Sequence, residues 1–334
     1  MNPPHTALVL GATGGIGGEV AHQLRQAGWR VRAMKRGLRT PPPADGLDWV
    51  AGDAMNAADV LAAAQGCSVI VHAVNPPGYR RWHELVLPMI DHTIAAARAH
   101  GATVVLPGTV YNHGPDAFPL LTEDSPQHPP TRKGAIRVAL ERRLQDAAEA
   151  GHIRVLIVRS GDFFGPRAGN NWFSQGMVKP GRPVTRVQLP ARPGVGHQFA
   201  YLPDVARTMV ELLQRREHLP AFAAFHMAGH WDADGRQFGQ AIQRAVVRHG
   251  GRAPTLQPFP WWLIRLASPL VTTLRELLEM RYLWQREVRM DNRRLLQVLG
   301  REPHTPLDEA IEATLQGIGC LGGRDNPTPV AGRA

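Results

Sequence analysis

The sequence has few of the residues that mark extracellular, metal-binding or membrane proteins. It contains two cysteines, Cys67 and Cys320, without metal-ligand spacing, so neither a disulfide framework nor a metal site is expected. The stretch closest to a membrane span, Trp261 to Leu274, is too short and contains Arg265 and Pro269. The first residues lack the pattern of a signal peptide. We therefore expect a cytoplasmic protein that does not enter a membrane.

Lysine is scarce as well. The formal net charge is +10, yet only Lys35, Lys133 and Lys179 among the 38 basic residues are lysine. The arginines are scattered along the chain, and no basic run exceeds two residues, which does not indicate a nucleic-acid partner. We expect solvated surface arginines and a small-molecule ligand of anionic character.

Short apolar runs rich in β-branched residues alternate with amphipathic stretches along the first half of the chain. The expected strands are Ala7–Leu10, Trp29–Met34, Leu47–Val50, Val69–Val74, Thr103–Leu106 and Arg154–Arg159. The expected helices between them are Ile16–Ala27, Ala57–Gln65, Trp82–His100 and Thr131–Ala150. This alternation predicts an α/β fold with a Rossmann-type, doubly wound parallel sheet.

The pattern loosens after Arg159 and suggests a division of the chain. We expect a Rossmann domain at 5–165, a smaller and mostly helical substrate-covering region at 166–196 and 231–320, and a return to the Rossmann domain at 197–230. The Gly- and Pro-rich segment 321–334 is expected to be a disordered tail. The later elements are expected as strands at His197–Leu202 and Phe225–Ala228 and as helices at Pro203–Arg216, 235–250, 261–298 and Pro306–Gly317.

Three glycines, Gly11, Gly14 and Gly17, stand three residues apart at the junction of the first strand and the first helix. The first allows a tight turn, the second lets the backbone approach a pyrophosphate, and the third lets the helix pack on the strand. The helix N-terminus then offers free N–H groups to the phosphates. This segment therefore predicts a dinucleotide site that includes Thr13, Gly15 and Ile16.

The tip of the second strand distinguishes NAD from NADP. An acid at this position bonds the ribose 2′-hydroxyl of NAD, whereas a cation accommodates the 2′-phosphate of NADP. Lys35 and Arg36 stand there with no acid in reach, so we predict that NADP(H) is preferred over NAD(H). A solvated strand end is the alternative for these two cations. Further cofactor contacts are expected at the ends of the third and fourth strands, from Asp53, Ala54, Ala73 and Asn75.

With these pieces in order, the chain resembles the extended short-chain dehydrogenase/reductase family, also called the NAD-dependent epimerase/dehydratase family. The resemblance spans roughly residues 5–320. Besides the glycine turn, it rests on Gly52-Asp53, His72-Ala73, Val110-Tyr111, Arg159 with Gly165-Pro166, and the Phe199 to Ala206 segment. It implies the fold, nucleotide binding, and homodimers as a possible assembly through the helices that flank the fourth and fifth strands.

The resemblance also implies a catalytic Ser or Thr, a Tyr, and a Lys four residues after the Tyr. None of the four tyrosines has a lysine at that spacing. In the family's frame Lys133 takes the Tyr position, Arg137 the Lys position and Pro107 the Ser/Thr position, which suggests an atypical branch. Lys133 is a candidate proton donor if a cation such as Arg137 lowers its pKa, or else a surface lysine or anion clamp. Tyr111 is a second candidate donor, or else a packed loop aromatic.

The substrate is expected to bind beside the nicotinamide, where Asn171 and Trp172 offer amide and aromatic groups. Two functions are open. One is an NADP(H)-dependent oxidoreductase or epimerase that acts on a small carbonyl, alcohol or sugar-like substrate with a non-standard proton donor. The other is a non-catalytic NADP(H)-binding redox sensor or interaction protein, which the missing catalytic set favours.

Overall fold

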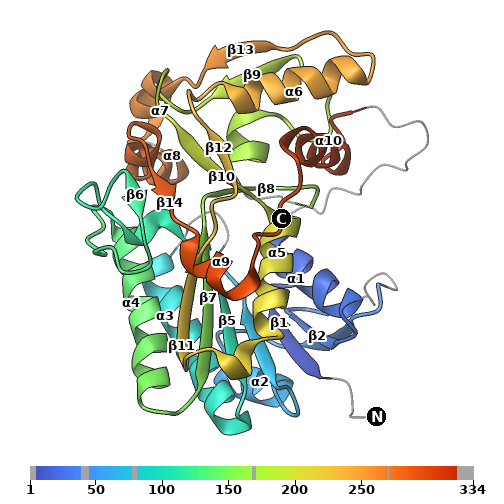
Figure 1. Ribbon diagram of the computed structural model, residues 1–334, viewed down its shortest axis with the longest axis vertical. Helices are drawn as coiled ribbons and strands as arrows, with labels where there is room; N and C mark the ends of the chain where they lie inside the picture. Colours follow the sequence, from blue (N-terminus) through green and yellow to red (C-terminus); the bar gives the residue numbers. More distant parts are fainter. Residues whose placement is uncertain (1–4, 39–44, 77–80, 168–170, 270, 322–334) are drawn as a thin grey trace.

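The computed structural model describes residues 5–38, 45–76, 81–167, 171–269 and 271–321. A seven-stranded sheet forms its centre, and all neighbouring strands in it are parallel (Figure 1). From one edge to the other the strands are β11 (Phe222–His226), β7 (Arg154–Ser160), β5 (Thr103–Thr109), β4 (Val69–His72), β1 (Thr6–Leu10), β2 (Arg30–Lys35) and β3 (Asp48–Ala51). The order reverses beside β1, where ligands bind in sheets of this kind.

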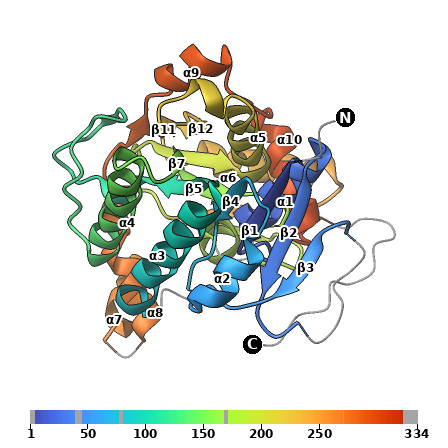
Figure 2. The ribbon, with the colours of Figure 1, turned by 90° about the horizontal axis from the view of Figure 1, so that it is seen from below.

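Helices cover both faces of the sheet (Figure 2). One face packs against α2 (Ala57–Ala63), α3 (Trp82–His100) and α4 (Arg132–Glu149). The other packs against α1 (Gly15–Gln26), α5 (Leu202–Leu213) and α9 (Arg293–Leu299). Side chains of a strand alternate between the two cores, so that Leu8 and Leu10 join the first and Ala7 and Val9 the second. The predicted fold class is confirmed, and each expected strand and helix of the first half is present, with ends shifted by a few residues.

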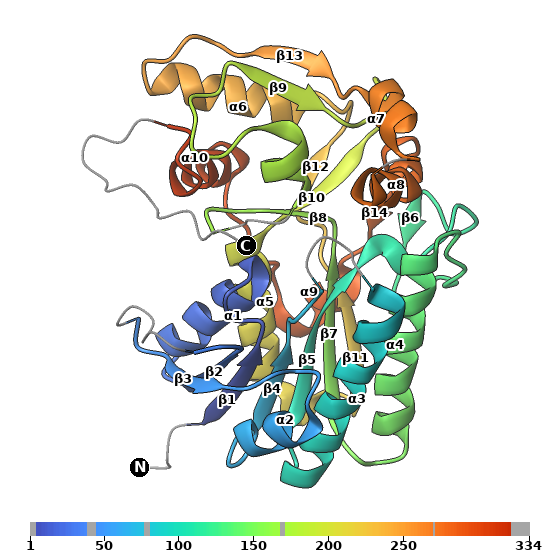
Figure 3. The same cartoon turned by 180° about the vertical axis from the view of Figure 1, so that it is seen from behind.

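A second region lies beyond the carboxyl ends of the sheet strands (Figure 3). The chain enters it at β8 (Asp162–Phe164), which follows β7 almost directly. It contains a three-stranded sheet in the order β12 (His230–Asp232), β10 (His197–Tyr201), β8, and a parallel pair of β13 (Thr255–Pro258) and β9 (Arg186–Leu189). Around these strands lie α6 (Gln237–Arg248), α7 (Trp261–Ala267), α8 (Thr272–Glu279), α10 (Leu307–Gly317), the π-helical turn η3 (Phe173–Met177) and the 3₁₀ turn η5 (Arg281–Trp284).

Two expectations about this region differ from the structure. The segment from 197 to 230 does not return to the main sheet as a whole, because β10 pairs with β8 and β12 while α5 and β11 do rejoin the first domain. Every residue of β10 is buried, and Phe199 stacks on Phe238 of α6 with ring centroids 3.8 Å apart. The sequence also did not predict the strands β9, β12 and β13 of this region. Residues 322–334 of the expected tail lie outside the described residues.

Shorter elements lie between the longer helices and strands. The 3₁₀ turn η2 (Val110–Asn112) follows β5, a second 3₁₀ turn η4 (Arg216–His218) precedes β11, and β6 (Leu120–Leu121) pairs in parallel with β14 (Arg289–Met290). Within the described ranges, none of the helices combines the length and apolar character needed to cross a membrane.

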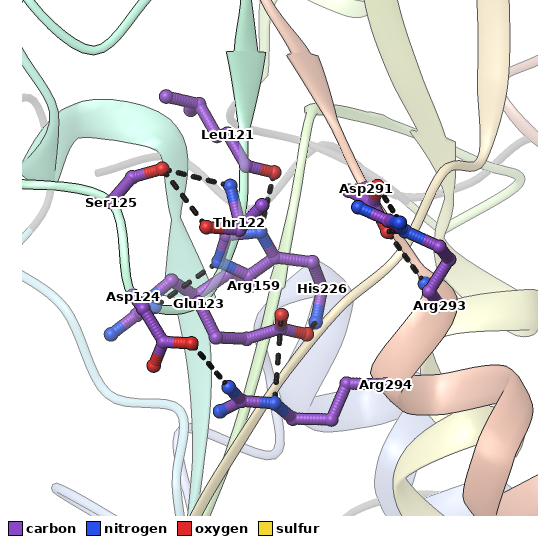
Figure 4. A network of polar contacts seen from close by, with 10 residues as sticks. All are labelled: Leu121, Thr122, Glu123, Asp124, Ser125, Arg159, His226, Asp291, Arg293 and Arg294. Atoms are coloured by element: carbon purple, nitrogen blue, oxygen red, sulfur yellow. Dashed lines mark hydrogen bonds and ion pairs between the residues drawn. The ribbon is translucent and has the colours of Figure 1, made fainter.

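A buried ion pair between Arg159 of β7 and Glu141 of α4 ties the sheet to its covering helix. The Arg159 Nε lies 3.1 Å from Glu141 Oε2, and both side chains are at most 5% exposed. The guanidinium also donates to His226 Nε2 at 3.1 Å, and the His226 ring donates through Nδ1 to the Leu121 carbonyl (Figure 4). Burial, with the Arg159 charge beside it, holds the pKa of His226 well below its usual value, so the imidazole is neutral.

Glu123 extends this network to the protein surface. Its carboxylate accepts from the His226 backbone N–H at 2.9 Å and lies 3.7 Å from the guanidinium of Arg294 on α9 (Figure 4). Arg294 in turn pairs with the exposed Asp124 at 2.7 Å. The network therefore joins β7, β11, α4 and α9.

Glu141→Gln removes the charge that compensates the buried Arg159. We expect the free energy of unfolding to fall by about 3–5 kcal/mol, because an uncompensated buried cation is left behind. Asp48→Asn is the matched control: Asp48 pairs with Arg30 at 2.6 Å but the two side chains are 45% and 63% exposed, and its loss should cost no more than about 1 kcal/mol. Urea denaturation measures both, and equal losses would contradict the assignment.

Candidate active site

A cavity of about 730 Å³ opens where the parallel strands end. It is lined by residues that follow β1, β2, β3, β4 and β5 and by residues of α3, α4 and the second region. All the residues predicted to bind the cofactor except Gly17 line it: Gly11, Thr13, Gly14, Gly15, Ile16, Lys35, Arg36, Asp53, Ala54, Ala73 and Asn75. The structure thus brings the separate sequence segments of that prediction to one site.

The glycine turn is as close-packed as its spacing predicts. Gly11 has a φ of +90°, and a Cβ there would lie 2.6 Å from the carbonyl oxygen of Ala73 at the end of β4. A Cβ on Gly17 would lie 2.2 Å from the Gly11 carbonyl oxygen, so Gly17 shapes the turn from behind instead of lining the cavity. Gly14 is the N-cap of α1 and donates its N–H to the Gly11 carbonyl at 2.9 Å. The N-terminus of α1 therefore points its free N–H groups toward the cavity.

The cavity has two chemically different ends. At one end, Lys35 and Arg36 at the tip of β2 are exposed and line it, together with Asp53 and Ala54, which follow the neighbouring strand β3. The Asp53 backbone N–H is used by the Asp59 carboxylate at 2.9 Å, and one Asp53 carboxylate oxygen accepts from the Met55 N–H at 3.0 Å. Since β2 lies next to the glycine turn, this end fits the adenosine half of a dinucleotide.

The nicotinamide half then extends to the opposite end, past β4 and β5. Pro107 and Thr109 of β5, Arg137 of α4, Phe163 of β8 and Asn171 line that end. Asn171 holds its loop in place, because its side-chain oxygen accepts from the Ser174 N–H and hydroxyl, both at 2.8 Å. Arg137 and Asn171 are therefore the predicted catalytic and substrate residues that the fold brings to the cofactor.

Lys133 does not line this cavity. It is 2% exposed, and its Nζ lies 2.6 Å from Glu276 Oε2 and 3.2 Å from Glu279 Oε2 on α8. The same nitrogen donates to the Glu276 carbonyl at 2.8 Å. Its ammonium is therefore held against the two carboxylates of α8 instead of facing the cavity. The geometry argues for a link between α4 and α8, not for the proton donor suggested by the sequence.

Tyr111 and Trp172 also lie outside the residues that line the cavity. Tyr111 is half-buried in η2 and packs into a small apolar cluster with Met280 and Leu283, as expected of a packed loop aromatic. Trp172 is 7% exposed, and its ring centroid lies 5.1 Å from that of Trp284 and 5.7 Å from that of Trp261. Trp172 therefore belongs to the core of the second region and supports its neighbour Asn171.

His72, at the end of β4, also lines the cavity. Its Nδ1 lies 2.8 Å from the Thr93 hydroxyl of α3. Burial, with a smaller effect of the Arg137 charge, lowers the pKa of His72 to about 3. The imidazole is therefore neutral at physiological pH. It can form hydrogen bonds, but it does not serve as an imidazolium acid.

Thr109 is the polar group that sequence reasoning missed. The family frame points to position 107, which is a proline, whereas the next hydroxyl on the same face of β5 is two residues further along. Thr109 Oγ1 accepts from the Tyr111 N–H at 3.2 Å, which fixes the rotamer of the side chain at the mouth of the cavity. The period of two along a strand could have indicated this substitution.

Among the described residues, one cluster could hold a metal ion although none was expected. Single ligand atoms of Asp204, His230 and His304 lie within 4.8 Å of one another. Asp204, however, already accepts from the Thr305 N–H at 2.7 Å and the Thr305 hydroxyl at 2.8 Å, and it pairs with Arg207. The carboxylate is satisfied by protein donors, so we assign no metal here.

Residues 7–226 match the NAD dependent epimerase/dehydratase family. The chain belongs to this family. The predicted resemblance is thereby confirmed, and it covers the Rossmann strands together with α5 and β11.

Individual relatives differ in what they bind. The chain is 30% identical over 176 residues to a 3-diazoavenalumate denitrifying reductase of a Streptomyces species, a match that covers 48% of this chain and 57% of the relative. The structure of MoeE5 in complex with UDP-glucose and NAD shares the fold, with a TM-score of 0.70, 20% identity, and coverage of 94% of this chain and 98% of that one. UDP-glucose 4-epimerase from Bifidobacterium longum, solved with NAD⁺ and UDP, has a TM-score of 0.69 at 16% identity, with coverage of 93% and 97%.

Gly17→Ala tests the glycine turn. Its new Cβ would meet the Gly11 carbonyl oxygen at 2.2 Å, and overpacking of this kind costs about 1–3 kcal/mol, so we expect NADPH to bind about ten- to a hundredfold more weakly. Gly18→Ala is the comparison one residue along α1, because its Cβ would lie at 3.0 Å from the Ala12 carbonyl oxygen, a tight but milder contact, and should weaken binding less. Titration by NADPH fluorescence, with circular dichroism as a check on folding, would show whether the two variants differ. Unchanged binding in Gly17→Ala would place the cofactor elsewhere.

Proposed function

We propose that the protein is an NADP(H)-dependent oxidoreductase that exchanges a hydride with the carbonyl or alcohol carbon of a small substrate. The observation that carries the proposal is the joining of two sets of residues in one cavity. The glycine turn with Lys35 and Arg36 forms one end, and Thr109, Arg137 and Asn171 form the other. The name of the Streptomyces relative, a reductase, supports reduction over epimerisation.

The residues at the adenosine end fit NADP better than NAD. Lys35 ends β2 and Arg36 follows it, both exposed and both lining the cavity. Two cations there can bond a ribose 2′-phosphate, and hydrogen bonds to charged groups contribute about 1.5–3 kcal/mol each. Asp53, which follows the neighbouring strand β3, also lines the cavity, and its carboxylate can accept from the adenine amino group.

NADPH bound in this way supplies a hydride from its nicotinamide C4 to the carbonyl carbon of the substrate, whose oxygen takes up a proton. Thr109 Oγ1 accepts from a backbone N–H, so its own hydroxyl proton can bond the carbonyl oxygen. His72 stays neutral and anchored to Thr93. The described residues at this end carry no phenol, thiol or carboxylate, so water delivers the proton while Thr109 orients the oxygen.

A sensor function is the second candidate, and a specific observation favours it. The residues in the family's catalytic Tyr and Ser/Thr positions, Lys133 and Pro107, provide no proton donor at the cavity: one is held by two glutamates and the other is an imino acid. The cofactor would then bind without turnover, and another protein would respond to the redox state of the bound cofactor.

The NADP preference predicts the outcome of a paired titration. We expect NADPH to bind about ten- to a hundredfold more tightly than NADH, from the strength of hydrogen bonds to charged groups. Lys35→Ala with Arg36→Ala should remove this difference by weakening NADPH alone. Arg30→Ala, at the far end of β2, is the control and should leave both affinities unchanged. Equal or tighter binding of NADH by the unaltered protein would refute the preference.

Turnover separates the enzyme from the sensor. With NADPH and a panel of small carbonyl compounds, we expect loss of absorbance at 340 nm, and we expect Lys133→Met and Tyr111→Phe to keep kcat within about threefold of the unaltered protein, since neither side chain lines the cavity. Thr109→Val should lower kcat by about a hundredfold, the size of one lost oxyanion donor. Tight NADPH binding with no turnover on any compound would favour the sensor.

A further inference from the structure

We propose that the substrate of this site is a small, mostly apolar carbonyl compound with one carboxylate, which pairs with Arg137, and that it is not a nucleoside diphosphate sugar. The inference rests on the proposed function, because it takes the nicotinamide to lie at the β5 end of the cavity. Four observations carry it: the size of the cavity, the apolar lining, the internally paired polar groups above it, and the position of one cation.

The cavity leaves limited room beyond the dinucleotide. Its volume of about 730 Å³ falls within the range of about 300–1,000 Å³ for ligand pockets. The lining residues of the glycine turn, β2 and β3 account for the adenosine and pyrophosphate of the dinucleotide. A nucleoside diphosphate sugar would add a further nucleotide and a sugar to the same space, whereas a compact molecule fits beside the nicotinamide.

The surface beside the nicotinamide is predominantly apolar. Carbon-rich side chains from five different parts of the chain meet there, namely Pro76, Leu85, Met89, Pro107, Phe163 and Leu202. Sugar hydroxyls would leave their hydrogen bonds unmade against such a surface, at a cost of about 1–3 kcal/mol for each buried unpaired group. An aryl or alkenyl group gains from burial against the same surface.

The polar groups of the second region above the cavity are already paired with one another. Asp162 Oδ2 lies 2.7 Å from His197 Nε2, and both side chains are 8% exposed. The His197 ring stacks on Trp284 with centroids 3.6 Å apart and planes 12° apart, and Trp284 is 1% exposed. None of these three side chains lines the cavity, so this layer offers no polar group to a ligand bound there.

Arg137 is the cation at the apolar end. Among the described lining residues, the other cations are Lys35 and Arg36 at the adenosine end and Arg81 at the start of α3, where it pairs with the exposed Glu84. Arg137 is half-buried on α4, and its guanidinium lies 5.3 Å from the Trp82 ring centroid, which holds the planar group in orientation. A planar guanidinium at an apolar surface is suited to bind a carboxylate through two parallel hydrogen bonds.

A matched pair of probes tests the proposal on the full-length protein loaded with NADPH. Trans-cinnamate and trans-cinnamamide have the same shape and differ in charge, and calorimetric titration gives the affinity of each. We expect cinnamate to bind about ten- to a hundredfold more tightly than the amide, the range for a hydrogen-bonded charge. UDP-glucose, titrated in the same way, should not bind. Arg137→Met should abolish the preference for cinnamate, and Arg137→Lys should keep part of it.

Arg81→Met is the control, because it removes a second lining cation, one that already pairs with Glu84 at the surface, and should leave the preference intact. Equal affinity for the two probes, no binding of either probe, or binding of UDP-glucose would overturn the inference. NADPH affinity is measured separately in the same preparations. Loss of NADPH binding in the unaltered protein would refute the proposed function itself, whereas tight NADPH binding with any of the three contrary results refutes only the substrate class.

Discussion

The close approach of backbone to backbone at the first turn is the constraint on which the rest of the site depends. Gly11 lies against the end of β4 and Gly17 lies against Gly11, at distances that no Cβ would allow. Because this turn fixes where β1 ends and α1 begins, it also fixes where the N–H groups of α1 point. The tips of β2 and β3 follow from their parallel register with β1. The position of the cofactor is thus set by sterics before any side chain contacts it.

This constraint explains why the cofactor half of the site could be predicted from the sequence. The spacing of the glycines predicts the backbone geometry of the turn, and continuous apolar runs predict which strands are covered on both faces. Lys35, Arg36, Asp53 and Asn75, the predicted cofactor contacts, line the cavity because each stands at or just after the end of a strand whose direction was already determined. The end of a strand depends on residues that are close together in the sequence, so a sequence pattern can predict it.

The substrate half depends on contacts between distant parts of the chain, and the sequence alone could not supply them. Lys133 donates a hydrogen bond to the carbonyl of Glu276, 143 residues later. No sequence pattern near either residue predicts this contact. The sheet to which β10 belongs is a second example. Its apolar run is equally suited to the main sheet, and only the burial of Phe199 against α6 shows that it joins β8 and β12 instead.

The pairing of Lys133 also decides how the neighbouring position is used. Lys133 and Arg137 lie one turn apart on α4, and two unpaired cations so close together would repel each other. Glu276 and Glu279 pair with the first and hold α8 against α4, whereas Arg137 lines the cavity. The two positions therefore differ in use: one cation joins two helices and the other faces the site. The proposed substrate class follows from this division, because a guanidinium that lines a cavity favours an anionic group on the ligand.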